Sequence, residues 1–539
     1  MPMLRILFVL CLFAGMAVAQ KGNVFTGTAD KAKLELVKQK IYAGQYISAI
    51  KSLDDLLKNS PNDANVHYYA GYSHFMLGKI EKAKEHFNKS IELNPAKANS
   101  YFMLGRIHQI DEKFDEAIEA YTKCTANTKQ GDEDAVDAQT YISQCQNAKK
   151  HMAAPVDVEI VNAGSDINSK FDDKNPCITA DGSTLVFTSR RPLNTQAEVD
   201  AEGDGKYFED VYLALYDTAA ASFKDAKPVP GSVNTKAHDA CTGISPDGKQ
   251  IFLYKNDIND KASRGGDIFI SKISNGKWRT PEPFGKPLAS SYWEGGACIS
   301  ADGKRLIFTS ERKGGLGGSD IWMVEKINKK EWGKPVNIGP PVNSEFDEGG
   351  VFLAPDGKTL FFCSNGPNSM GSYDVFKTVY ENGKWSEPQN LGYPINSSGR
   401  EGQLAISANG KTAYISSDRK GGEGETDIYK VNLKNYAILE KDNKIKTSNG
   451  LSILKGTIRD GYEGFGLAEA EIVITDNAGA SIASTTSNEN GEYFLTLKGG
   501  ETYKITISKK GFKEVTETFD LKLDTKETFV LEKGYLLKK

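Results

Sequence analysis

Five carboxylates recur at one position of a long internal repeat. Each lies eight residues before an Asp-Gly or Asn-Gly turn, and the five residues are Asp173, Asp239, Glu294, Glu348 and Glu401. If these side chains gather at one mouth of a ring, they would focus a negative potential and attract a cation or a basic segment. The alternative is structural, because a carboxylate could pair with an arginine ten residues after the turn. Three repeats contain that arginine, as Arg191, Arg312 and Arg419.

A second set of acids begins the third expected strand of each repeat: Asp210, Asp267, Asp320, Asp374 and Asp427. One acid per repeat beside a glycine-rich loop is most simply an acceptor that fixes the turn. In the first repeat, Asp200-x-Glu202-x-Asp204-Gly205 resembles the opening of a calcium loop. Position 12 of such a loop requires a glutamate, and Val211 stands there instead. An exposed acidic loop is therefore the alternative to a calcium site.

Signatures of catalysis are missing from the sequence. There is no Gly-x-Ser-x-Gly elbow, and a Ser-His-Asp triad would have to use His238, the only histidine after His151. The other histidines, His67, His74, His86 and His108, do not have the spacing of a metal site. We expect a protein that is not an enzyme and that binds no cofactor or metal. The net charge of −4 gives no support for nucleic-acid binding.

The acids are positioned by repeated hairpins. Their turns lie at residues 181–182, 247–248, 302–303, 356–357 and 409–410, at intervals of 66, 55, 54 and 53 residues. We expect positive φ at both central residues of each turn. A period near 50 residues with several strands per unit indicates a β-propeller. Residues 158–433 are therefore predicted to form five blades.

Two further markers keep the blade spacing. Asn168, Asn234, Ala289, Asn343 and Asn396 follow the same intervals, and Trp-x-x-Pro at Trp278, Trp332 and Trp385 opens a fourth strand. No tryptophan follows the last blade, whereas Val158 to Asn162 lies where a missing strand should be. We predict that this N-terminal segment completes the last blade. The repeats resemble the WD40-like propeller of the TolB type. The residues that carry the resemblance include Ser-Ala-Asp-Gly-Lys at 300–304 and Gly-Gly-x-Asp-Ile at 317–321.

Residues 30–150 are predicted to be helical with a period of 34 residues. Gly44-x-Tyr46-x-x-Ala49 recurs as Gly78-x-Ile80-x-x-Ala83 and as Glu112-x-Phe114-x-x-Ala117. The pattern resembles the tetratricopeptide repeat, which implies a solenoid with a concave groove. Candidate groove residues that would grip a peptide are Tyr68, Tyr69, Tyr72 and Tyr101, with packing between repeats as the alternative. The sequence leaves open whether Cys124 and Cys145 form a disulfide.

The last domain is expected over residues 452–533, after a polar linker. Alternating strands are predicted at 454–458, 470–474, 491–495 and 503–507. The pattern resembles the carboxypeptidase regulatory-like domain, a small β-sandwich similar to transthyretin. The fold class is therefore multidomain: an all-α solenoid, a five-bladed propeller and a small sandwich.

Residues 1–19 are predicted to be a secretory signal peptide. Arg5 precedes an apolar run from Ile6 to Phe13, and Ala17-Val18-Ala19 forms a small-x-small cleavage site. The run is too short for a membrane helix, which needs about 20 apolar residues, and no other stretch could span a membrane. We therefore expect an exported protein.

The domain order resembles periplasmic envelope proteins of Bacteroidetes, including PorE-type components associated with type IX secretion. Those proteins usually continue into a peptidoglycan-binding OmpA-like domain, which this sequence does not show, so direct anchoring to peptidoglycan is not expected. The resemblance implies a non-enzymatic periplasmic scaffold at the outer membrane, which binds envelope proteins through the helical groove and a propeller face. The alternative is a module that binds glycan or peptidoglycan fragments, with Tyr292 and Trp293 beside Glu294 stacking on a sugar.

Overall fold

The computed structural model describes residues 28–539 apart from 129–132, 202, 256–265, 275, 329–330, 434–435, 437, 440–449 and 525–526. The expected signal peptide and most of the expected linker lie outside the described residues. The chain divides into a helical unit, up to Lys149 and including Asn194–Tyr207, and a β unit, Lys150–Leu193 and Phe208–Lys539. No helix among the described residues is long and apolar enough to cross a membrane.

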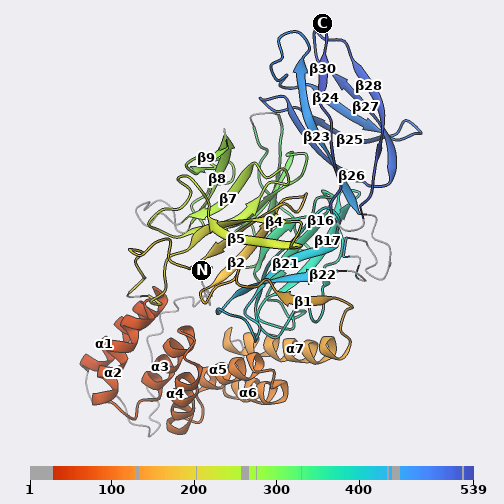
Figure 1. Ribbon diagram of the computed structural model, residues 1–539. Helices are drawn as coiled ribbons and strands as arrows, with labels where there is room; N and C mark the ends of the chain where they lie inside the picture. Colours follow the sequence, from red (N-terminus) through yellow and green to blue (C-terminus); the bar gives the residue numbers. More distant parts are fainter. Residues whose placement is uncertain are drawn as a thin grey trace. The chain divides into compact units, whose positions relative to one another are not determined.

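The helical unit is a solenoid of paired helices (Figure 1). Its elements are α1 (Thr28–Tyr42), α2 (Tyr46–Asn59), α3 (Ala64–Met76), α4 (Ile80–Leu93), α5 (Ala98–Ile110), α6 (Phe114–Asn127) and α7 (Glu133–Ala153). The helices α2, α4 and α6 begin 34 residues apart, and so do α3 and α5. The predicted tetratricopeptide-like solenoid is confirmed.

The 34-residue period has a packing cause. Gly71 of α3 lies against the ring of Phe87 in α4, where an added Cβ would stand 2.7 Å from the ring. Gly105 lies against Tyr121 in the same way, at 2.6 Å. The helices of each pair therefore approach closely only because these positions lack a side chain. Cys124 and Cys145 are both buried in this unit and form no disulfide with each other.

The β unit begins with five antiparallel sheets. The first contains β2 (Asp173–Ile178), β3 (Thr184–Ser189), β4 (Asp210–Asp217) and β5 (Ser222–Pro228). The second contains β6 (Asp239–Ile244), β7 (Gln250–Lys255), β8 (Asp267–Ser274), β9 (Lys277–Trp278) and β10 (Glu282–Pro283). The third contains β11 (Glu294–Ile299), β12 (Arg305–Ser310), β13 (Asp320–Glu325) and β14 (Val336–Asn337).

The fourth and fifth sheets repeat this order. The fourth contains β15 (Glu348–Leu353), β16 (Thr359–Ser364), β17 (Asp374–Glu381), β18 (Lys384–Trp385) and β19 (Gln389–Asn390). The fifth contains β20 (Glu401–Ile406), β21 (Thr412–Ser417), β22 (Asp427–Asn432) and β1 (Glu159–Asn162). The first strands of the sheets contact one another in chain order from β2 to β20, and β20 also contacts β2.

The last sheet is completed by the N-terminal strand, as the sequence predicted. Strand β1 pairs antiparallel with β22, and Ile160 stands opposite Val431. Asn168 fixes this arrangement, because its side-chain oxygen accepts from the amide of Ile428 at 2.9 Å and its amide group donates to the Ile428 carbonyl at 2.8 Å. The asparagine marker has the same role in three other sheets, where Asn234, Asn343 and Asn396 bind Val211, Ile321 and Val375.

The five turns differ from the expected type. Only the glycine of each has positive φ, between 66° and 76°, and the preceding aspartate or asparagine does not. In the third sheet the amide of Gly303 donates to the Ser300 carbonyl at 2.8 Å, and Asp302 accepts from the Lys304 amide at 3.0 Å. This pattern is that of a type I turn followed by a left-handed glycine, in which the aspartate holds the loop through its side chain.

The C-terminal domain is a sandwich of two sheets. The first is β26 (Glu492–Lys498), β23 (Leu451–Asp460), β29 (Val530–Glu532) and β30 (Tyr535–Leu537). The second is β25 (Ser481–Thr486), β24 (Glu471–Thr475), β27 (Glu501–Ser508) and β28 (Val515–Leu521). Their inner faces bury apolar side chains such as Leu454, Ile472 and Ile505.

This domain contacts the turn region of all five preceding sheets. Lys249 pairs with Glu492 at 2.5 Å, Lys304 donates to the Ser484 carbonyl at 3.3 Å, and Thr496 donates to the Pro355 carbonyl at 2.5 Å. Thr528 bridges the remaining two turns, because its hydroxyl donates to the Ala180 carbonyl and accepts from the Asn409 amide. A small apolar contact of Ala180, Ala408 and Ile453 lies beside these bonds. Both parts of the β unit are therefore joined by a mostly polar interface.

Candidate functional site

The five predicted acids all begin the first strand of a sheet, and all are buried. Asp173, Asp239, Glu294, Glu348 and Glu401 are at most 1% exposed. Their oxygens face donors of the chain itself, namely a serine or threonine four residues earlier and, in four sheets, a basic side chain. The geometry thus provides internal ion pairs, and whether these residues also bind a partner or cation stays a prediction.

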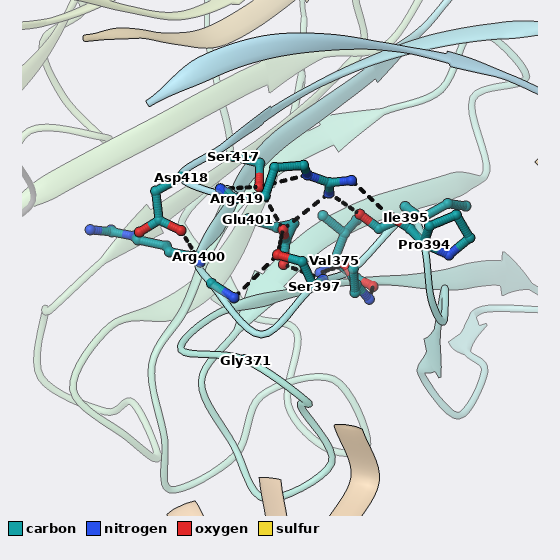
Figure 2. A network of polar contacts seen from close by, with 12 residues as sticks. Gly371, Val375, Pro394, Ile395, Ser397, Arg400, Glu401, Ser417, Asp418 and Arg419 are labelled. Atoms are coloured by element: carbon teal, nitrogen blue, oxygen red, sulfur yellow. Dashed lines mark hydrogen bonds and ion pairs between the residues drawn. The ribbon is translucent and has the colours of Figure 1, made fainter. Parts of the chain in front are cut away.

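Figure 2 shows this arrangement in the fifth sheet. The guanidinium of Arg419 lies 3.2 Å from Glu401 and donates to the carbonyls of Pro394 and Ile395 at 2.9 and 2.7 Å. Ser397 and Ser417 donate to the same carboxylate at 2.6 and 2.8 Å. The arginine therefore ties the start of one strand to the loop before it, and neither charge is left unpaired.

The same bridge occurs in the first and third sheets, through Arg191 with Asp173 and Arg312 with Glu294. In the second sheet the base is Lys255, which lies 2.6 Å from Asp239 and donates to the Val233 carbonyl at 3.4 Å. The sequence did not suggest this pair, because Lys255 stands two positions earlier in its repeat than the arginines. The alternative of internal pairing therefore describes four sheets.

The fourth sheet lacks the base. Gly366 stands where three other repeats have arginine. Among the described residues, Glu348 accepts from the Ser344 amide and hydroxyl, at 3.0 and 2.6 Å, and from the Ser364 hydroxyl at 3.2 Å. No described lysine or arginine forms an ion pair with Glu348. Burial raises the pKa of this carboxyl to about 7, because the hydrogen bonds from Ser344 and Ser364 offset only part of the cost of burying its charge.

The acids that begin the third strand of each sheet were predicted to fix the preceding loop. In the third and fourth sheets, these acids accept hydrogen bonds from amides of that loop. Asp320 accepts from the amide of Leu316 at 2.9 Å, and Asp374 accepts from those of Met370 and Gly371 at 2.8 and 2.9 Å. Asp210 differs, because one of its oxygens has no hydrogen-bond partner among the described residues. Burial, then the charges of Asp239 and Glu209, raise the pKa of Asp210 to about 8.

The acidic loop of the first repeat closes on itself. Asp200 accepts from the Gly203 amide at 2.9 Å, and the Gly205 amide donates to the Asp200 carbonyl at 2.8 Å. Glu202 lies outside the described residues. Within the helical unit, the Gly203 carbonyl accepts from the Ile47 amide at 3.1 Å in the first turn of α2. The carbonyl thus satisfies one of the amides that a helix start leaves unpaired.

The four candidate tyrosines lie on two helices of the solenoid. Tyr68, Tyr69 and Tyr72 share α3, and Tyr101 is on α5. Tyr68 is buried at 9% exposure with Lys97 over its ring, whereas the other three are half-buried. Tyr68 therefore packs between repeats, while Tyr69, Tyr72 and Tyr101 keep part of their surface open. Their role in binding stays a prediction.

Three of the histidines come together, which the sequence did not suggest. His67 of α3 and His86 of α4 approach through their Nδ1 atoms at 3.0 Å, and His74 stacks on His86 with ring centroids 5.5 Å apart. Burial lowers the pKa of His74 to about 4, and burial followed by the charge of His67 lowers that of His86. The rings of His74 and His86 are therefore predominantly neutral at pH 7.

Comparison with known families identifies two parts of the chain. A model described as the carboxypeptidase regulatory-like domain matches residues 453–532, and one described as anaphase-promoting complex, cyclosome, subunit 3 matches residues 43–124. Neither spans half of the chain. No curated protein is a significant match. The predicted regulatory-like domain is thus confirmed.

The chain is similar to several solved structures over 22–26% of its length. MamA is 26% identical, with 22% of this chain and 68% of that chain covered at a TM-score of 0.21. The first TPR of Spaghetti (RPAP3), bound to an HSP90 peptide, is 20% identical, with 22% and 92% covered at 0.20. SycD of Yersinia enterocolitica, in complex with a YopD peptide, is 12% identical, with 24% and 99% covered at 0.22. Another TPR domain, 18% identical, is covered over only 35% of its length.

Proposed function

We propose that the chain is a non-enzymatic scaffold that binds partner proteins through its helical solenoid. The observation that carries the proposal is the stack of helix pairs with a 34-residue period, since stacked repeats present an extended concave surface suited to a peptide segment. Half-buried aromatic side chains on α3 and α5 would supply contact area at low entropic cost.

The five sheets are, in this proposal, the blades of a WD40-like propeller. The contacts of successive first strands, the return of β20 to β2 and the completion of the last sheet by β1 support it. In four of the five sheets, the buried acids then hold the blades in shape through internal ion pairs. The regulatory-like domain covers the turns, so a partner of the propeller would use surfaces other than the turn region.

The proposed compartment rests on the predicted signal peptide and on the resemblance to envelope proteins. We propose an exported protein of the periplasm, associated with the outer membrane, with a role in type IX secretion or envelope assembly. The glycan-binding alternative gains no support from the aromatic pair beside Glu294. Trp293 is half-buried and packs toward Tyr254, with ring centroids 6.2 Å apart, so it is no open stacking platform.

Affinity purification of the tagged full chain from envelope membranes tests this function. Stable co-purification with outer-membrane proteins, in stoichiometric amount after washing in high salt, is the expected result. Retention on purified sacculi without any protein partner would refute the scaffold and favour glycan binding.

A further inference from the structure

The histidine pair of the helical unit has a geometry that the scaffold function does not use. His67 and His86 are both half-buried, with Nδ1 atoms 3.0 Å apart and ring centroids 5.3 Å apart. They border an open pocket of about 540 Å³, which is also lined by Glu85, Asn88, Lys89 and Glu92. Two imidazoles that contact each other at the wall of an open pocket are unusual in a packed solenoid.

The proton positions follow from a third atom. Nε2 of His67 lies 3.0 Å from the Pro61 carbonyl oxygen, which can only accept. Nε2 therefore holds the proton of the neutral ring, and Nδ1 of His67 presents its lone pair to His86. Donation of the far ring nitrogen to a backbone carbonyl is also the support that metal-binding histidines typically have, because it fixes the tautomer and the ring orientation.

We propose that Nδ1 of His67 and Nδ1 of His86 bind one divalent transition-metal ion of the zinc, copper and nickel class. Nitrogen ligands lie about 2.0–2.1 Å from zinc, so two of them in tetrahedral geometry are about 3.3 Å apart. The observed separation of 3.0 Å is within a small ring rotation of that value. Imidazole nitrogen is a preferred ligand of these ions.

The binding step balances without any other reactant. In the metal-free pair, His86 donates its Nδ1 proton to the lone pair of His67. When the ion takes the place of that proton, the proton of His86 moves to its Nε2 through solvent, and both rings remain neutral. No group of three or more His, Cys, Asp or Glu side chains among the described residues has metal-site geometry, so water from the pocket supplies the remaining ligands.

His74 is a positioning residue in this site. Its ring is 7% exposed and lies nearly parallel to that of His86, with an interplanar angle of 16°. The stacking limits rotation of the His86 ring and keeps Nδ1 directed at His67. The site therefore lies between two helices of one repeat, and each ligand comes from a different helix.

Cobalt titration of the full chain tests the site, because Co²⁺ replaces Zn²⁺ and absorbs visible light. We expect one Co²⁺ per chain, displaced by one Zn²⁺, and affinity weakened by more than about tenfold in both His67→Ala and His86→Ala. His108→Ala is the matched control, since His108 lies on α5 outside the pair, and it should bind as the parent does.

Two outcomes would overturn the proposal. One is binding by His67→Ala and His86→Ala with the affinity of the parent, and the other is no saturable binding by the parent. Helical circular dichroism of each variant verifies that the solenoid is folded. Electron paramagnetic resonance of the Cu²⁺ form gives a second reading, because two coordinated nitrogens are expected in the parent and at most one in either variant.

Discussion

Glu348→Gln should stabilise the β unit at neutral pH and not at acid pH. The carboxyl is 1% exposed and has no basic partner, and its pKa is raised from 4.5 to about 7 by burial. The folded state holds this proton more tightly than the unfolded state does. The stability that this difference contributes is fully present below pH 4.5 and is lost progressively up to about pH 7. One pKa unit corresponds to about 1.4 kcal/mol, so the loss over this window is about 3 kcal/mol.

The glutamine variant removes this titration. Relative to the parent, its free energy of unfolding should rise by about 3 kcal/mol between pH 4 and pH 8, whatever constant offset the amide introduces. Urea unfolding at each pH, followed by tryptophan fluorescence, measures this difference. All five tryptophans lie between residues 278 and 385, so the signal reports on the β unit.

Glu294→Gln is the matched control, because the same position in the third sheet is paired with Arg312 at 3.1 Å. Removal of one partner leaves a buried guanidinium uncompensated, which typically costs about 3–5 kcal/mol. The control should therefore be destabilised at pH 8, where Glu348→Gln is stabilised. Parallel pH profiles for Glu348→Gln and the parent would refute the reasoning.

Three further predictions concern packing and docking. Gly71→Ala should lower the stability of the solenoid by about 1–3 kcal/mol, because the added Cβ would stand 2.7 Å from the Phe87 ring. Thermal circular dichroism at 222 nm measures this loss, and a gain in stability would contradict the prediction. Glu112→Gly should raise that stability by about 0.5–1 kcal/mol, because Glu112 has φ of 61° where the other repeats have glycine; an unchanged melting curve would contradict it. Glu492→Lys should increase amide exchange in β26 by repelling Lys249, and adding Lys249→Glu to the same chain should reverse the increase. Equal exchange in the single and the double variant would show that the ion pair does not contribute to docking.

The sequence predicted features that depend on local period and turn chemistry. The 34-residue helix pairs and the pairing of β1 with β22 are confirmed, because small residues at helix crossings and a missing fourth strand leave signals at fixed intervals. The positions of the Asp-Gly turns were predicted correctly, but their turn type was predicted wrongly. The aspartate holds the turn with its side chain, so only the glycine needs positive φ.

Features that depend on distant packing were not predictable. Lys255 reaches Asp239 from a position that has serine in the other repeats, so no repeat pattern reveals it. His67 and His86 are 19 residues apart, and only the packing of α3 on α4 joins them. Strand β25 (Ser481–Thr486) was missed because its small polar residues do not alternate, whereas its pairing with β24 stabilises it.

The central claim, that the solenoid binds partner proteins, is tested most directly by quantitative capture with matched tyrosine variants. Tyr101→Glu places a charge on the half-buried surface of α5, and Tyr462→Glu makes the same change at a side chain of the C-terminal domain that is 96% exposed. From the same envelope extract, we predict that Tyr101→Glu loses most of the protein captured by the parent, while Tyr462→Glu retains it. Equal capture by both variants, with the solenoid shown to be folded, would contradict the account.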